Sequence, residues 1–257
     1  MKKLAFFLVP LAALIISYRS YGQVPTVKDE LAKAQALAKQ GNTVEASAVY
    51  TDIMGKYPNN RDAVQGWLIL NMKRSPTGEE EAIKHLEELE KTYPDNTGIM
   101  FFKAFIQAEY NHSDEALATI DKLISIQPDT ALNYILKGQL LESVNRDEEA
   151  LEALNRSTML DPKNSDAWQI RAGLLLKAKR YDDAILSYDR AIQLVPGQPV
   201  FLYNRGCAYC LKGDFENALA DLGKAISINP RFKSSAVSDE DYKSLWENED
   251  FKKLTSQ

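Results

Sequence analysis

The chain contains few of the residues that usually carry catalysis or bind metal ions. Its 257 residues include two cysteines and two histidines, and His85 and His112 lie far apart, outside any metal-binding spacing. Neither a Gly-x-Ser-x-Gly motif nor a glycine-rich phosphate loop is present. We therefore expect a protein that is not an enzyme and has no metal site and no cofactor, with both histidines solvated on helices.

Basic clusters are also scarce. The formal net charge is −5, and no block of lysine and arginine follows the first three residues. A general nucleic-acid binder carries a basic surface, so this class of function is disfavoured. Hydrophobic residues make up 45% of the chain and charged residues 26%, which is the composition of a folded globular protein.

A long apolar run occurs only at the N-terminus. Two lysines precede an apolar run over residues 4–16, and Ser20 and Gly22 occupy the small-residue positions of a cleavage site. This pattern predicts a secretory signal peptide at residues 1–22, cleaved after Gly22. The run is shorter than the ~20 residues of a membrane-spanning helix, and an uncleaved anchor is the alternative. We expect a periplasmic or secreted protein that is not inserted in the membrane after cleavage.

Proline and alanine recur with a fixed period of 34 residues. The prolines are Pro94, Pro128, Pro162, Pro196 and Pro230, and the alanines are Ala82, Ala116, Ala150, Ala184 and Ala218. A fixed period in this range indicates a solenoid, in which supersecondary units stack on their neighbours. Tiny residues recur at the same step on the first helical segments of four units, at Ala104, Gly138, Ala172 and Gly206. They predict two helices that cross too closely for a larger side chain.

Each unit contains two amphipathic segments with a turn between them. In residues 165–196, Trp168, Ala172 and Leu175 share one helical face. A second apolar stripe follows, made up of Tyr181, Ala184, Ile185, Tyr188, Ala191 and Ile192. Apolar spacings of three and four predict helices rather than strands, and the proline that follows ends the second helix. The sequence therefore predicts an all-α fold.

These patterns resemble the tetratricopeptide repeat family. Matching positions in the last two units are Trp168, Ala172, Leu175, Ala184, Tyr188, Ala191 and Pro196, then Leu202, Gly206, Tyr209, Ala218, Leu222, Ala225 and Pro230. Earlier matches are Ala34, Leu37, Gly41, Ala46, Tyr50 and Pro58, then Met100, Ala104, Ala116, Ile120 and Pro128, then Tyr134, Gly138, Leu141, Ala150, Leu154 and Pro162. The resemblance implies an exported bacterial member of the family, folded as a right-handed α-solenoid of six helix-turn-helix repeats with a C-terminal capping helix.

The period divides the chain into parts. We predict a signal peptide at 1–22, a linker at 23–26 and C-terminal capping helices at 233–257. The six repeats are predicted at residues 27–60, 61–96, 97–130, 131–164, 165–198 and 199–232. The second repeat is longer than the others, and its extra residues fall within 74–78, between its two helices.

The repeat pattern stops before the C-terminus. Ser238 followed by acidic residues is a helix-start signal, and Asn248 predicts a second short helix. The apolar residues of these helices are Tyr242, Leu245, Trp246, Phe251 and Leu254. Because the ends of a solenoid need a cap with a polar outer face, we interpret residues 233–257 as that cap; a partner-binding tail is the alternative.

Cys207 and Cys210 form a Cys-x-x-Cys pair. Redox versions of this motif place the first thiol at a helix N-terminus, whereas this helix is predicted to begin near Val200. No second pair completes a zinc site. We expect packing or groove-lining cysteines, with a redox dithiol as the alternative.

Basic residues recur every 34 residues on the first helices, at Lys103, Lys137, Arg171 and Arg205. By the resemblance, Arg205 pairs with Asp221 on the second helix of its own repeat. The other three lack an acid at the equivalent position. Ion pairs within repeats are expected of the series as a whole, with contact of one of these three residues to an acidic ligand as the alternative.

By the resemblance, the first helices line a concave groove that binds a partner. The residues expected to face it are Phe101, Phe105, Leu132, Ile135, Gln139, Gln169, Leu176, Tyr203, Cys207 and Cys210. Phe101 and Phe105 lie one turn apart, so they either hold one apolar side chain of a partner together or pack between repeats.

Three functions follow from this interpretation. The leading one is a non-enzymatic protein–protein interaction module that binds a peptide or a helix of an envelope protein in its groove. The first alternative is a structural spacer or assembly scaffold in a cell-envelope complex. The second is a thiol redox module that uses Cys207 and Cys210. The expected partner is a protein or peptide rather than a nucleic acid, and the oligomeric state is left open.

Overall fold

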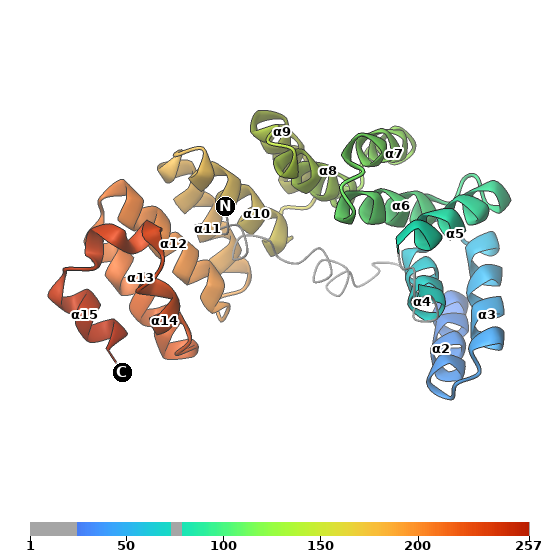
Figure 1. Ribbon diagram of the computed structural model, residues 1–257, viewed down its shortest axis with the longest axis horizontal. Helices are drawn as coiled ribbons and strands as arrows, with labels where there is room; N and C mark the ends of the chain where they lie inside the picture. Colours follow the sequence, from blue (N-terminus) through green and yellow to red (C-terminus); the bar gives the residue numbers. More distant parts are fainter. Residues whose placement is uncertain (1–24, 73–78, 257) are drawn as a thin grey trace. The chain divides into compact units, whose positions relative to one another are not determined.

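The computed structural model describes residues 25–72 and 79–256, and all regular elements in these residues are helices (Figure 1). Each predicted repeat contains two consecutive helices: α2 (Pro25–Lys39) and α3 (Thr43–Lys56), α4 (Arg61–Met72) and α5 (Glu79–Thr92), α6 (Thr97–Glu109) and α7 (Ser113–Ile126), α8 (Ala131–Ser143) and α9 (Asp147–Leu160), α10 (Ser165–Lys177) and α11 (Tyr181–Leu194), α12 (Pro199–Lys212) and α13 (Phe215–Ile228). We call the earlier member of each pair the first helix and the later member the second helix. The all-helical repeat fold is confirmed.

Some predictions concern residues outside the described ranges. They are the signal peptide at 1–22, the first two residues of the linker and the insertion within 74–78. The rest of the predicted linker is helical, since α2 begins at Pro25. Proline is tolerated in the first turn because the N–H groups there have no partner within the helix.

The described residues belong to two compact units. The N-terminal unit ends at Val144, after α8, and the C-terminal unit begins at Asn145, before α9. In the N-terminal unit α2 packs on α3, α3 on α4, and α6 on α7. In the C-terminal unit α10 packs on α11, α11 on α12, and α12 on α13. Consecutive helices thus form hairpins, as the repeat pattern predicts.

The turns between first and second helices share one backbone feature. Asn111, Asn145, Lys179 and Gly213 all have positive φ, at 65°, 60°, 60° and 89°, and follow one another at the 34-residue step. Glycine adopts this left-handed conformation without strain, and asparagine tolerates it better than most side chains. Lysine at position 179 is the least suited of the four, so the fold rather than local preference holds its backbone there.

Tiny residues lie where helices approach closely. The repeated alanines Ala116, Ala150, Ala184 and Ala218 are fully buried. In the N-terminal unit, a Cβ atom on Gly66 of α4 would lie 2.3 Å from Cζ of Tyr50 on α3. That approach was not foreseen, because the register of the second repeat departs from the repeat pattern. His85 is also less solvated than expected, since its ring meets Trp67 edge-on at 5.9 Å.

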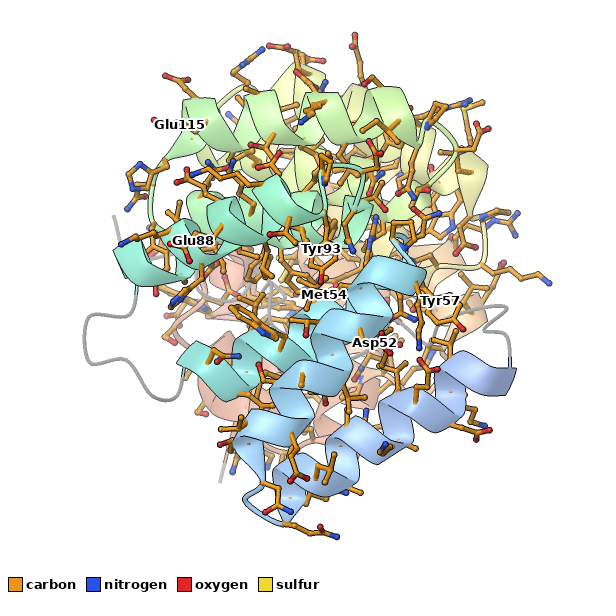
Figure 2. The ribbon with its side chains drawn as sticks, turned by 90° about the vertical axis from the view of Figure 1, so that its right-hand side faces the viewer. Asp52, Met54, Tyr57, Glu88, Tyr93 and Glu115 are labelled. Carbon is orange, nitrogen blue, oxygen red and sulfur yellow. The ribbon has the colours of Figure 1, made fainter. Side chains whose placement is uncertain are left out.

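The second helices of the N-terminal unit have distinct inner and outer sides (Figure 2). Met54 on α3 is fully buried, whereas Asp52, Glu88 and Glu115 are exposed. The amide nitrogen of Asn96 donates to the backbone oxygen of Met54 at 2.9 Å, so the residue before α6 is attached to α3. Burial of one apolar side per helix is the packing expected of amphipathic helices.

The chain after the last repeat forms three short helices: α14 (Phe232–Ala236), the 3₁₀ helix η1 (Glu240–Leu245) and α15 (Glu249–Thr255). Asn248 caps α15 as predicted, because its side chain accepts hydrogen bonds from the N–H groups of Asp250 and Phe251. The predicted cap at Ser238 is wrong by one residue. Asp239 caps η1 instead, while the Ser238 hydroxyl lies 3.2 Å from the backbone oxygen of Ser235, at the end of α14.

Candidate partner-binding surface

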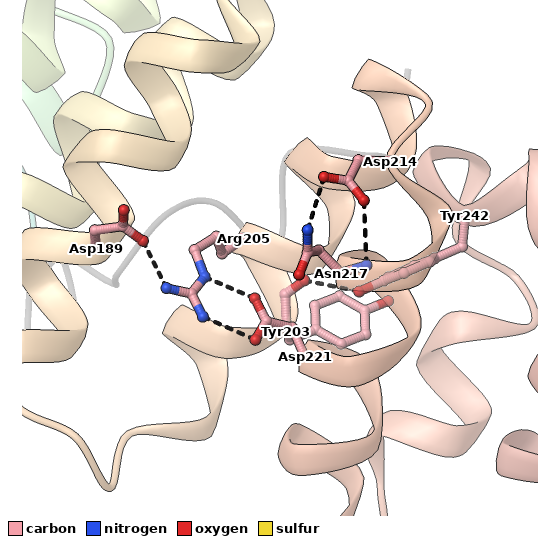
Figure 3. A network of polar contacts seen from close by, with 7 residues as sticks. All are labelled: Asp189, Tyr203, Arg205, Asp214, Asn217, Asp221 and Tyr242. Atoms are coloured by element: carbon pink, nitrogen blue, oxygen red, sulfur yellow. Dashed lines mark hydrogen bonds and ion pairs between the residues drawn. The ribbon is translucent and has the colours of Figure 1, made fainter.

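Arg205 joins three helices of the C-terminal unit. Its Nε and Nη2 atoms donate to the two carboxylate oxygens of Asp221 on α13, at 2.6 and 2.8 Å. Its Nη1 atom donates to Asp189 on α11 at 2.5 Å (Figure 3). The hydrogen bond to Asp221 is the main reason that the pKa of Arg205 is raised. The predicted pair is confirmed, and Asp189 is an additional partner from the preceding repeat.

The other members of the basic series also have partners. Lys103 Nζ lies 2.8 Å from Glu90, and Lys137 Nζ lies 2.7 Å from Asp121. Arg171 donates to Asn155 at 2.6 Å and to Ser187. Glu90, Asp121 and Asn155 all lie on the second helix of the preceding repeat, where the sequence interpretation did not look. These side chains are therefore used within the fold, which argues against the acidic-ligand alternative.

The cysteine pair lies inside α12, as predicted. Both thiols are free, and Cys207 and Cys210 are 1% and 2% exposed. Burial raises the pKa of Cys207 well above its ordinary value and that of Cys210 to about 11, and the carboxylates of Asp239 and Asp241 act in the same direction. A redox dithiol needs a lowered thiol pKa, so the environment of this pair opposes that chemistry.

Tyr203 on α12 contacts the C-terminal segment, residues 232–256. Its hydroxyl donates to Asp239 Oδ2 at 2.7 Å, and its ring stacks on Phe232 with centroids 4.6 Å apart. The Tyr242 hydroxyl in turn donates to the backbone oxygen of Tyr203 at 2.9 Å. Burial raises the pKa of both tyrosines, so these hydroxyls remain protonated donors. This contact was not foreseen from the sequence.

A side chain at position 206 would meet two other parts of the structure. A Cβ atom there would lie 2.1 Å from the Tyr242 hydroxyl and 3.3 Å from the backbone oxygen of Ala218 on α13. The second contact confirms the close approach of two helices within a repeat. The first comes from the C-terminal segment and is the tighter restriction.

The two phenylalanines of the predicted groove do not form a simple pair. Phe101 is 5% exposed, and the Arg61 guanidinium lies 4.1 Å above its ring centroid. The Phe102 ring meets Phe101 and Phe105 edge-on, at 5.5 and 6.5 Å. Phe105 remains half-buried. Packing between helices, which was the alternative, therefore describes Phe101, and Phe105 is the member that retains accessible surface.

The remaining predicted groove residues are buried. The exposed fractions are 9% for Leu132, 0% for Ile135, 5% for Gln139, 3% for Gln169, 5% for Leu176 and 2% for Tyr203. Together with Phe101 and the two cysteines, nine of the ten predicted residues thus have less than a tenth of their surface exposed. Their role in partner binding stays a prediction. Arg61 and Phe102, which contact the Phe101 ring, and Asn133, which accepts a hydrogen bond from Arg61, were missed because the sequence pattern does not show which side chains overlap.

Two further observations concern the residues that the structure describes. These residues contain no group of three or more histidine, cysteine or acidic side chains arranged to hold a metal ion. In the same ranges, we find no helix with the length and apolar content needed to cross a membrane.

Comparison with known proteins connects the fold to a family. Tetratricopeptide repeat family models match residues 135–199 and 199–232. No curated protein sequence matches the chain significantly. Among solved structures, the chain is similar to Pseudomonas aeruginosa pilF, with 14% identity over 85% of this chain and 96% of that one, at a TM-score of 0.62.

Two more solved structures show the same fold. A tetratricopeptide repeat protein from Parabacteroides merdae is 16% identical over 91% of this chain and 100% of that one, with a TM-score of 0.56. YrrB, described as a tetratricopeptide repeat protein with an unusual peptide-binding site, is 19% identical over 70% of this chain and 92% of that one, with a TM-score of 0.54.

Proposed function

We propose that the chain acts as a tetratricopeptide repeat protein and binds a peptide or a helix of an envelope protein along the first helices of its repeats. The observation that carries this proposal is the match of residues 135–232 to a family whose repeats typically act as non-enzymatic scaffolds. The peptide-binding site in the description of YrrB supports the same mode of action by analogy.

The chemistry of the described side chains supports binding rather than catalysis. The thiols of Cys207 and Cys210 are buried with raised pKa values, and the basic series on the first helices is engaged within the fold. A binding surface instead needs apolar anchors with some accessible area, together with polar groups that fix the register. Phe105 on α6 is the anchor that the predicted groove offers.

We further propose that the protein acts in the periplasm or outside the cell, after cleavage behind Gly22. The support is a short apolar run that follows two lysines and precedes a small-residue cleavage site. Intact-mass analysis of the protein recovered from the producing cells tests this directly. A chain that begins at Gln23 is expected, and a chain that retains its first 22 residues in the cytoplasmic fraction would contradict the proposal.

Capture of partners from periplasmic extract tests the mode of binding. The chain from Gln23 to Gln257 serves as bait. Phe105→Ala is compared with Ile228→Ala, because Ile228 is an apolar residue on a second helix and its side chain is 49% exposed. We expect Phe105→Ala to reduce the recovery of the main partner at least about tenfold, the effect of losing about 1.4 kcal/mol. Ile228→Ala should leave it unchanged, and circular dichroism should show intact helices in both variants.

The structural-scaffold alternative has an observation of its own. Leu194 and Ile228, at the ends of α11 and α13, are 38% and 49% exposed and lie one 34-residue period apart. Exposed apolar residues at repeated positions are suited to contacts made by the second helices. If Leu194→Ala and Ile228→Ala abolish capture while Phe105→Ala does not, the protein acts as a scaffold through that side.

A further inference from the structure

The C-terminal segment, residues 232–256, does not continue the repeat stacking of the C-terminal unit. Where one repeat follows another, the first helix packs chiefly on the second helix before it, as α12 does on α11. In the C-terminal segment α14 and α15 contact α13, but η1 packs on α12, which is a first helix. The segment therefore reaches the helix that carries the last three residues of the predicted groove.

Contacts between η1 and α12 are specific as well as apolar. Tyr242 is fully buried, places its hydroxyl over Gly206 and donates to the backbone oxygen of Tyr203. Asp239, the cap of η1, accepts the hydroxyl hydrogen of Tyr203 and lies 4.0 Å from Cys207 Sγ. As a result, the side of α12 that was predicted to meet a partner is already occupied by the chain itself.

The segment has the features of a unit that opens separately from the repeats. Its helices span five, six and seven residues, too short to be stable without tertiary contacts. It is held by a few buried side chains, chiefly Phe232, Tyr242, Leu245 and Phe251. Chain termini and short peripheral elements commonly open at a lower free energy than the whole domain.

We propose that the C-terminal segment covers one side of α12 reversibly. The segment must leave before a partner can contact Tyr203, Cys207 or Cys210. Opening of the segment is a property of the fold and stands without any partner. Its consequence for binding rests on the proposed function, since only a partner that uses the first helices competes with the segment.

The buried thiols report the opening. The reduced chain is labelled with N-ethylmaleimide over a series of urea concentrations below the unfolding midpoint, and intact mass gives the labelling rate. We expect Cys207 and Cys210 to react faster than global unfolding allows, with a weaker dependence on urea than the unfolding curve from circular dichroism. A local opening exposes less surface than global unfolding and so has a smaller urea dependence.

Tyr242→Phe sharpens the test without removing the aromatic ring. Losing one hydrogen bond of ordinary strength corresponds to a change of about fivefold, so labelling should accelerate about 3- to 10-fold. The matched control is Tyr181→Phe in the same unit, since the Tyr181 hydroxyl makes no hydrogen bond to another described residue. Labelling of this control should match that of the unaltered chain.

Two results would overturn the proposal. One is labelling with the same urea dependence as global unfolding, which would make the segment an integral cap. The other is an increase in the labelling rate of Tyr242→Phe that is no larger than the change in the global stability of this variant explains. Partner capture separates the two proposals: if the opening is observed but Tyr242→Phe does not increase capture, the segment opens as inferred while the last repeat takes no part in partner binding.

Discussion

The two compact units connect their repeats by different chemistry. In the C-terminal unit, Arg205 joins α11, α12 and α13 through two carboxylates, one of them almost completely buried. In the N-terminal unit, the side chains of Asn59, Thr97 and Gln127 hydrogen-bond one another at the turns between repeats. The unit that contains Arg205 also contains most of the residues that match the family models. The basic series joins repeats in both units, since Lys103 pairs with Glu90 and Lys137 with Asp121, but the bidentate arginine contact occurs in the C-terminal unit and the polar cluster at the turns in the N-terminal unit.

The largest expected difference between the two units is in the free energy of unfolding lost when an acid that pairs with the basic series is removed. Asp221→Ala leaves the guanidinium of Arg205, which is 17% exposed, without its bidentate partner and should cost about 3 kcal/mol. Glu90→Ala in the N-terminal unit should cost about 1 kcal/mol, because Lys103 and Glu90 are more solvated as a pair. Urea unfolding followed by circular dichroism measures both.

Asp182→Ala is the control for this pair of variants. Asp182 lies 2.6 Å from Lys212, but its side chain is 78% exposed, so its loss should change the free energy of unfolding by less than about 0.5 kcal/mol. Equal effects of Asp221→Ala and Asp182→Ala would show that the contact between Arg205 and Asp221 does not hold the C-terminal unit together.

Gly206→Ala should destabilise the C-terminal unit by about 2 kcal/mol, although alanine is the better helix former. The added methyl group meets the Tyr242 hydroxyl. In a Tyr242→Phe background that oxygen is absent, and the cost should fall below about 1 kcal/mol. A double-mutant cycle in urea unfolding gives the coupling, and strictly additive effects would be inconsistent with the close approach.

Replacing Asn204 by leucine should stabilise the chain by about 1 kcal/mol. Asn204 is 3% exposed and its amide nitrogen has no hydrogen-bond partner in the described ranges, whereas Phe102, Leu136 and Ile170 occupy the equivalent position in other repeats. The counterpart in the N-terminal unit is Asn133→Leu. It should destabilise by about 1–3 kcal/mol, because the Asn133 side chain accepts a hydrogen bond from Arg61. Thermal unfolding of both variants checks the opposite signs.

The smallest expected effect lies in the turns. Lys179→Asn should stabilise the C-terminal unit by about 0.5 kcal/mol, since Lys179 is exposed and has positive φ. The reverse change in the N-terminal unit, Asn111→Lys, should cost a similar amount. If both variants shift the unfolding midpoint in the same direction, backbone preference does not explain the turns.

The helix pairs were predictable because they depend on local spacing. Prolines and alanines at a constant step, with apolar residues three and four apart, identify helices and turns from neighbouring residues alone. The pair of Arg205 with Asp221 followed from the resemblance to a family. Asn248 as a cap followed from its place before acidic residues.

Contacts between elements distant in the sequence were not predictable. The partners of Lys137 and Arg171 lie in the preceding repeat, and Arg61 reaches over Phe101 from a different repeat. Ser238 and Asp239 are equally good capping residues by type, and the contact of Asp239 with Tyr203 distinguishes them only in the folded chain. The burial of the predicted groove residues was not foreseen for the same reason, since a sequence pattern indicates a helix face without showing what covers it.

Hydrogen exchange of the chain, alone and with its captured partner, tests the proposed mode of binding most directly. We predict added protection in peptides from α6, which carries Phe105, with exchange at the ends of α11 and α13 unchanged. Protection confined to the ends of α11 and α13, with α6 exchanging as in the free chain, would contradict binding along the first helices.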